Sequence, residues 1–255
     1  MQFIDSHTHL YLKQFEQDRD EVIESAIKLG IEKMVLPNID SNSIQPILKI
    51  CQQYPNHCFP TLGLHPSSVN KNYKKELKII EDWIKEVEIC AIGEIGIDLY
   101  WDKTNIEEQK EALKSQIKIT IKNDLPIIIH SRESFNEIID VLDTFKSEKL
   151  TGIFHCFTGT IEQAEIIISR GFSLGIGGVV TFKNSGLDNT LKNIDISHII
   201  LETDSPYLAP VPKRGQRNES SYLVHIAKKI AEIKSMTIKE VAEITTQNAL
   251  QLFRI

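Results

Sequence analysis

The chain has 255 residues and a formal net charge of −6, with 41% hydrophobic and 25% charged residues. These values are typical of a folded globular protein, and the acidic balance excludes a protein that coats nucleic acid through bulk positive charge. The sequence also lacks a run of about 18 apolar residues, which excludes a membrane-spanning helix.

Short apolar runs alternate with longer amphipathic segments along the chain. The candidate strands cover residues 3–5, 33–36, 58–62, 89–93, 126–129, 151–154, 172–176 and 198–202. Helical patterns separate them, and the clearest begins at a capping box predicted from Thr104 and Glu107. Eight such units predict parallel strands that close into a TIM (β/α)8 barrel, whereas six would favour an open doubly wound sheet.

The last part of the chain continues this pattern without a low-complexity linker. A proline-rich loop at 205–217 precedes two helical segments, at 219–233 and from a second capping box at Thr237 and Glu240 to Phe253. A length of about 150 residues per domain would suggest two domains, but a barrel of roughly 250 residues is commonly one. We therefore predict a single domain over residues 1–255.

The cysteines and the N-terminus indicate the compartment. None of the four cysteines belongs to a C-x-x-C pair, so reduced thiols are expected. Residues 1–10 carry Asp5 and two histidines in place of a basic segment followed by an apolar run, so no signal peptide is expected. We expect a cytoplasmic protein without membrane contact, for which a monomer is plausible.

Histidines and carboxylates follow the predicted strands at their C-terminal ends, where the active site of a barrel forms. His7 and His9 follow the first strand, and residues i and i+2 of an extended segment face the same way, so this pair can bind one ion. The other strand-end residues are Glu94, His130, His155 and Asp204. One polar residue after an apolar strand is commonplace, but six on five strands predict a metal site.

The ligand types suit two divalent ions, with zinc, manganese, cobalt and magnesium as candidates. The expected ligands are His7, His9 and Asp204 for one ion and His130 and His155 for the other. Glu94 can bridge both ions through its two oxygens. Ions about 3.5–4 Å apart clamp the attacking and leaving oxygens of a displacement and acidify a shared water, giving a bridging hydroxide. Asp204 is placed to act as the general base.

Each of these residues lies in a longer motif. The motifs are D-S-H-T-H-L at 5–10, G-L-H-P at 63–66, G-E-I-G-I-D at 93–98, I-H-S-R at 129–132, H-C-F-T-G at 155–159, E-T-D-S-P-Y-L at 202–208 and R-G-Q-R-N-E at 214–219. Nearly end to end, the chain resembles the TatD family of metal-dependent deoxyribonucleases, within the wider amidohydrolase-like barrels.

The resemblance implies the same ligand set and a phosphodiester substrate, with 3′-5′ exonuclease-like or abasic-site cleavage of DNA. The chain departs from the family at Ser220, where proline often follows Asn-Glu, and this affects the start of a helix but not the metals. Glu94 takes the place of the modified lysine found in some amidohydrolase relatives, so the bridge needs no carbamylation.

Three further residues are candidates for substrate binding or for orienting a ligand. The resemblance implies that His65 faces the substrate phosphate, with a bond to a loop carbonyl as the alternative. Arg132 can form a bidentate pair with phosphate, or an ion pair with a loop acid. Glu202 can orient a metal-bound histidine, or pair with Arg214 or Arg217.

The surroundings of these residues add weaker candidates. Asp98 and Tyr100 are expected in a loop that borders the substrate groove. Trp101 and Tyr207 can stack on bases, although packing explains each equally well. Cys156 should point away from the metals, which argues against a catalytic thiol.

Three functions compete on this sequence. A DNase acting on single-stranded DNA or damaged ends is favoured, and its contacts should be short because the chain lacks a basic stripe. An ester or amide hydrolase, for instance one that removes a D-amino acid from tRNA, would use the same metals. A non-enzymatic metal-binding scaffold would require a closed site, whereas a barrel mouth leaves room for water and substrate.

Overall fold

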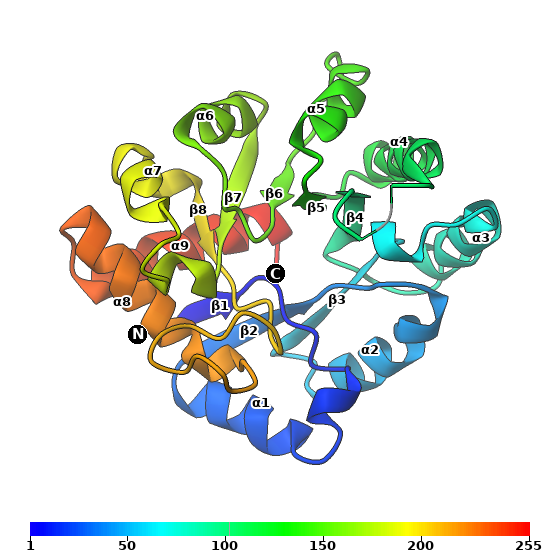
Figure 1. Ribbon diagram of the computed structural model, residues 1–255. Helices are drawn as coiled ribbons and strands as arrows, with labels where there is room; N and C mark the ends of the chain where they lie inside the picture. The colour runs from blue at the N-terminus through cyan, green and yellow to red at the C-terminus, as the bar shows by residue number, and fades with distance from the viewer. Residues whose placement is uncertain (102) are drawn as a thin grey trace.

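The computed structural model describes residues 1–101 and 103–255, in which eight parallel strands form one sheet in sequence order (Figure 1). The strands are β1 (Phe3–Asp5), β2 (Ile31–Leu36), β3 (Cys58–Leu62), β4 (Ala91–Asp98), β5 (Ile127–Arg132), β6 (Gly152–Phe154), β7 (Phe172–Ile176) and β8 (Ile199–Leu201). The helices are α1 (Arg19–Lys28), α2 (Ser41–Gln53), α3 (Tyr73–Ile84), α4 (Ile106–Asn123), α5 (Phe135–Asp143), α6 (Ile161–Ser169), α7 (Leu187–Asn193), α8 (Leu223–Lys234) and α9 (Ile238–Phe253). Short 3-10 helices are η1 (Lys13–Phe15), η2 (Pro66–Ser68), η3 (Gly178–Thr181), η4 (Ile196–His198) and η5 (Ser220–Tyr222).

The sheet curves into a barrel around which the helices form an outer layer (Figure 1), confirming the predicted (β/α)8 architecture. Backbone contacts connect the last strand to the first: the N–H of Ser6 donates to the carbonyl of Leu201 at 3.1 Å, and the N–H of Asp204 donates to the carbonyl of His7 at 2.8 Å. The segments carrying two expected ligands are therefore fixed side by side.

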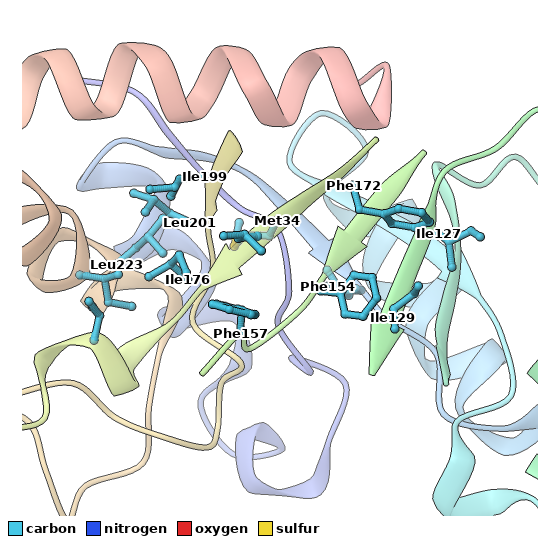
Figure 2. Close-up of a cluster of buried hydrophobic side chains, with 14 of the residues drawn as sticks. Met34, Ile127, Ile129, Phe154, Phe157, Phe172, Ile176, Ile199, Leu201 and Leu223 are labelled. Carbon is cyan, nitrogen blue, oxygen red and sulfur yellow. The ribbon is translucent and has the colours of Figure 1, made fainter. Parts of the chain in front are cut away.

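Alternation along the strands divides the apolar residues into two layers. One layer contains Ile4, Val35, Ile128, Ile153 and Ile200, with Ala249 and Phe253 of α9 in the same buried cluster. Their strand neighbours belong to the larger cluster between sheet and helices, and Figure 2 shows part of it. The first layer thus fills the barrel, and α9 packs against its base.

The observed elements differ from the predicted ones mainly at their ends. The predicted fourth strand stops at 93 and the fifth at 129, whereas β4 extends to Asp98 and β5 to Arg132, where the two strands remain paired. Helix α4 begins at Ile106 with Asn105 as the N-cap residue, so Thr104 is not the N-cap that the predicted capping box requires. The capping box at Thr237 is confirmed.

Two simpler expectations can be compared with the structure. All four cysteines are free. In the described part of the chain, no helix combines the length and the apolar character needed to cross a membrane.

Candidate metal centre

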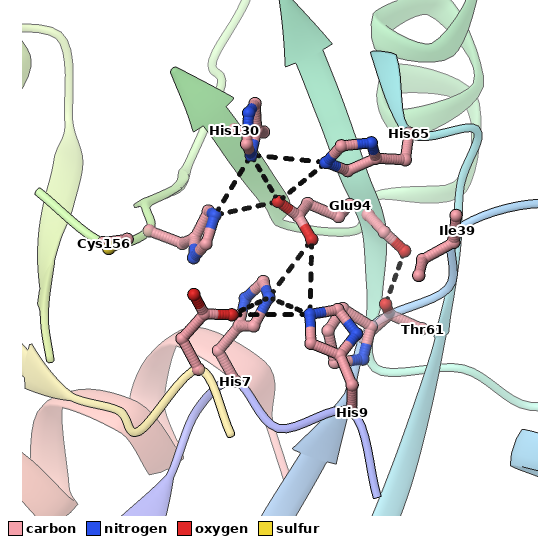
Figure 3. A network of polar contacts seen from close by, with 12 residues as sticks. His7, His9, Ile39, Thr61, His65, Glu94, His130 and Cys156 are labelled. Carbon is pink, nitrogen blue, oxygen red and sulfur yellow. Dashed lines mark hydrogen bonds and ion pairs between the residues drawn. The ribbon is translucent and has the colours of Figure 1, made fainter. Parts of the chain in front are cut away.

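The strand pattern explains why polar side chains converge at one end of the barrel. His130 lies two residues beyond the interior residue Ile128, and His155 lies two beyond Ile153, so each imidazole enters the layer above the apolar interior. Glu94 lies within β4, whereas the sequence predicted that it follows the fourth strand. Figure 3 shows these side chains gathered around the Glu94 carboxylate.

Glu94 divides the cluster into two halves with its two carboxylate oxygens. Its Oε2 lies 3.2 Å from His7 Nε2 and 3.8 Å from His9 Nε2. Its Oε1 lies 2.7 Å from His130 Nδ1 and 2.8 Å from His155 Nε2. This division is the one that a carboxylate bridging two ions requires.

Asp204 completes the half formed by the first two histidines. Its Oδ1 lies 3.4 Å from His9 Nε2 and 3.7 Å from His7 Nε2. The backbone of Asp204 has φ 56°, a left-handed conformation that is costly for a residue other than glycine and that tends to occur at functional sites.

Hydrogen bonds on the outer nitrogens determine which nitrogen of each histidine carries its proton. The Tyr11 hydroxyl donates to the carbonyl of Pro37 at 2.8 Å, so at 2.9 Å from His9 Nδ1 it must accept a proton from that nitrogen. The Asp98 carboxylate lies 2.9 Å from His130 Nε2 and likewise requires an N–H there. In both rings the outer nitrogen thus carries a proton, and the inner nitrogen of the neutral ring is the one that can bind a metal.

Glu202 lies beside the outer nitrogen of His155. Its Oε1 accepts the N–H of Cys156 at 2.6 Å and lies 3.4 Å from His155 Nδ1. A Cβ on Gly175 would lie 2.3 Å from Glu202 Oε2, so a glycine is needed at this position to admit the carboxylate. The proposed role of Glu202 in orienting a histidine thus has a geometric basis.

The alternative partners of Glu202 are engaged elsewhere. Arg217 donates to Asp18 at 2.7 and 2.8 Å and to Glu219 at 3.0 Å. The guanidinium of Arg214 lies 3.9 Å over the ring of Phe182.

His65 differs from the other histidines because its proton lies on the nitrogen that faces inward. Its Nδ1 accepts the N–H of Ser67 at 3.1 Å, and burial lowers the pKa of the ring, so the neutral form carries its proton on Nε2. That Nε2 lies 3.4 Å from Glu94 Oε1 and 3.3 Å from His130 Nδ1. His65 therefore lies against the cluster, but it offers a hydrogen-bond donor in place of a ligand lone pair.

The ring nitrogens and carboxylate oxygens of the cluster converge on one space. The Nε2 atoms of His7 and His9 face each other at 3.2 Å, although the Tyr11 contact leaves His9 with a lone pair at that atom. Two carboxylates point into the same space. Nitrogen and oxygen ligand atoms that converge in this way fit a divalent cation such as zinc, manganese or cobalt. Among residues 1–101 and 103–255, three groups could hold an ion: His7, His155 and Asp204; His7, His9 and Glu94; and His65, Glu94 and His130.

The charges in the cluster agree with this fit. Burial opposes ionisation of Glu94, yet the surrounding histidines, His155 foremost, hold the pKa of its carboxyl well below its ordinary range. For Asp204 burial also opposes ionisation, but the surrounding histidines His9, His155 and His7 together lower the pKa of its carboxyl. Burial lowers the pKa of His7, which keeps that ring neutral. Both carboxylates are therefore anions.

A buried carboxyl group holds the two ligand-bearing segments together. Asp5 accepts the N–H and the hydroxyl of Thr203 at 2.9 and 2.6 Å, and the N–H of His7 at 3.4 Å. Burial raises the pKa of Asp5 to about 7. Asp5 thus joins the end of β1 to the residue before Asp204.

The remaining candidates lie around the rim. The Arg132 guanidinium lies 3.9 Å from the centre of the Tyr100 ring and 5.3 Å from that of Trp101. Tyr207 lies across the mouth, its ring centre 6.1 Å from that of His9. Figure 3 draws Cys156 on the outer side of the cluster, and burial raises the pKa of its thiol well above its ordinary value. A neutral thiol is a poor nucleophile.

The positions of two residues of the site were not predicted from the sequence. Asp98 was expected in a loop, but it ends β4 and is buried against His130. Its spacing of four residues from Glu94, an even number along a strand, was the available signal. Tyr11 lies two residues after His9, which continues the spacing of the two histidines. Only the fold shows that its hydroxyl donates to the Pro37 carbonyl.

Comparisons with known proteins agree with this geometry. Residues 4–254 match the family model described as TatD related DNase. The chain is 38% identical to the uncharacterized metal-dependent hydrolase YabD of Bacillus subtilis, over 98% of both chains. It is 32% identical to the 3′-5′ ssDNA/RNA exonuclease TatD of Salmonella typhimurium, also over 98% of both.

A solved structure shows the same architecture. The TatD homologue YjjV of Escherichia coli superposes with a TM-score of 0.93 at 26% identity, covering 99% of this chain and 98% of the other. Sequence, fold and a histidine–carboxylate cluster at the barrel mouth thus agree, and the chain belongs to the TatD-related DNase family of metal-dependent hydrolases.

Proposed function

We propose that this protein is a two-metal phosphodiesterase that cleaves single-stranded nucleic acid, with DNA as its main substrate. The observation that carries the proposal is the division of the Glu94 carboxylate, whose oxygens face separate pairs of histidines. The name of the Salmonella relative, a 3′-5′ ssDNA/RNA exonuclease, supports the substrate class. Exonuclease-like action from a 3′ end and cleavage at abasic sites are both within this proposal.

One ion would be held by His7, His9, Glu94 and Asp204, and the other by Glu94, His130 and His155. Such a pair supplies Lewis-acid polarisation of the phosphate and acidifies water. Bound dications would also offset the acidic net charge of −6 where a phosphate must lie.

The protein side chains supply the proton transfer and the orientation. Asp204, anionic and at the inner edge of the mouth, accepts the proton of the attacking water. His65 directs its Nε2–H toward a non-bridging phosphate oxygen, where it stabilises negative charge. Asp98, Tyr11 and Glu202 keep the histidine lone pairs directed at the cluster.

The test is cleavage of end-labelled substrates by protein stripped with a chelator and reloaded with magnesium, manganese or zinc. The substrates are single-stranded DNA, single-stranded RNA, abasic duplex DNA and a D-aminoacyl-tRNA. We expect metal-dependent shortening of the single strands, lost in Asp204→Asn and in chelated protein. Release of the amino acid with intact nucleic acid would instead identify a deacylase. No product from any substrate with loaded protein would refute a hydrolase acting on nucleic acid.

A further inference from the structure

Aromatic side chains are exposed at the barrel mouth. Tyr100 is 51% exposed and Trp101 is 71% exposed, directly after the end of β4. Among the described residues, the large exposed hydrophobic side chains include one more aromatic ring, Tyr207, in the segment after β8. Rings of this size stabilise a protein when buried, so their concentration on the active-site face indicates a surface that a ligand covers.

The first two rings are held in place by a cation. The Arg132 guanidinium lies 3.9 Å over Tyr100 and 5.3 Å from the centre of Trp101. The rings of Tyr100 and Trp101 meet edge to face, with their centres 4.9 Å apart. Each side chain therefore limits the motion of the other two, and less conformational entropy remains to be lost when a ligand binds.

The backbone beneath these side chains is connected to the metal centre. Asp98 Oδ1 accepts the N–H of Tyr100 at 2.9 Å and that of Trp101 at 3.2 Å, while Oδ2 contacts His130 Nε2. The N–H of Leu99 donates to the carbonyl of Arg132 at 3.0 Å. One carboxylate thus sets both the orientation of a candidate metal ligand and the position of the rings.

We propose that Tyr100, Trp101 and Arg132, called here the aromatic platform, bind the nucleobase of a nucleotide next to the scissile phosphate. The platform rests on the proposed nuclease function and specifies how its substrate is recognised. The indole of Trp101, the more exposed of the two rings, stacks on the base, and the edge of the Arg132 guanidinium donates to a phosphate oxygen.

This recognition selects single-stranded substrates because a base inside a duplex has no free face. Stacking tolerates any base and either sugar, so the platform suits both DNA and RNA without sequence preference. It also provides affinity through a few local contacts, as an acidic chain without a basic stripe requires.

A spectroscopic test follows from the two tryptophans of the chain, Trp83 and Trp101. In a Trp83→Phe background, Trp101 is the sole indole. Metal-loaded protein titrated with a nuclease-resistant phosphorothioate oligothymidylate should show saturable quenching of its fluorescence. An oligomer of the same length that carries only abasic sugars should quench it far less. Equal or absent quenching by both would contradict base stacking.

A kinetic test separates stacking from loss of the fold or of the metals. Trp101→Ala should lower kcat/KM on single-stranded DNA about fivefold or more. The loss should fall below about twofold on oligomers whose abasic residue occupies the stacked position, found by moving one abasic residue along the strand. The matched control is Leu29→Ala, because Leu29 is an exposed apolar residue at the end of α1.

Arg132→Ala is compared with Arg254→Ala, which removes the same charge from an arginine paired with Asp124, after the last helix. Only Arg132→Ala should weaken cleavage. If wild-type protein cleaves DNA and Trp101→Ala matches it within twofold on every oligomer, the platform is refuted while the nuclease function stands. If wild-type protein cleaves no nucleic acid, both proposals fall.

Discussion

The Tyr11 hydroxyl is the most direct place to test how the protein prepares its histidines for metal. It donates to the Pro37 carbonyl at 2.8 Å and accepts from His9 Nδ1 at 2.9 Å, and the side chain is only 8% exposed. Tyr11→Phe keeps the ring and removes both hydrogen bonds. A buried carbonyl and a buried N–H then lose their partners, and His9 can turn its proton toward the metal.

The expected magnitude follows from these two losses. Removing an outer partner of a ligand typically weakens metal binding about 10- to 100-fold. Leaving buried polar groups unpaired should lower the free energy of unfolding of the metal-free protein by about 1–3 kcal/mol. Calorimetric titration of zinc into the stripped protein measures the first quantity, and urea denaturation the second.

The control is Tyr54→Phe, which alters a half-buried tyrosine whose hydroxyl accepts from Gln53 Nε2 at 3.5 Å. It should leave zinc affinity unchanged. If Tyr11→Phe binds zinc within twofold of wild type, the inferred proton on His9 Nδ1 is wrong, whatever happens to stability.

Three further changes test other contacts. Glu94→Gln should reduce metal content below one ion per chain by mass spectrometry, since an amide replaces both anionic oxygens; retention of two ions would exclude the bridge. His65→Asn should keep both ions but lower kcat/KM on DNA at least about tenfold, because a donor to phosphate is lost; loss of an ion would make His65 a ligand. Hydrogen bonding to Arg217 lowers the pKa of Asp18, so this pair stabilises the fold fully above the ordinary aspartate pKa and loses its effect as pH falls through the lower folded value. Arg217→Met should therefore destabilise by less than about 1 kcal/mol at neutral pH, and the difference from wild type in urea denaturation should shrink in acid; a constant difference would contradict the ion pair.

The fold was predictable because its signals are local and repeated. Apolar runs of three to five residues at regular spacing specify parallel strands, and polar residues at their ends identify the active face. The ends of β4 and β5 were not predictable, because pairing between the two strands extends both as far as Asp98 and Arg132. At the C-terminal ends of these strands, polar side chains are buried by their contacts with one another in the site and not by packing against an apolar face.

The site was predictable as a set of residue types and not as a network. Their positions at strand ends predicted that Glu94 and the histidines lie close together. The positions of the protons on these histidines were not predictable, because they depend on contacts between distant segments. Tyr11 meets the Pro37 carbonyl across 26 residues, and Asp98 meets His130 across 32. No local pattern encodes such pairs, since only the pairing of neighbouring strands brings them into contact.

The central claim is that hydrolysis requires two ions bridged by Glu94 at the barrel mouth. The most direct measurement is cleavage of end-labelled single-stranded DNA by stripped protein that receives zero, one or two equivalents of manganese. The account predicts no product at zero, full activity only near two equivalents, and none at any loading in Asp204→Asn. Cleavage by chelated protein, or saturation of the rate at one equivalent, would contradict it.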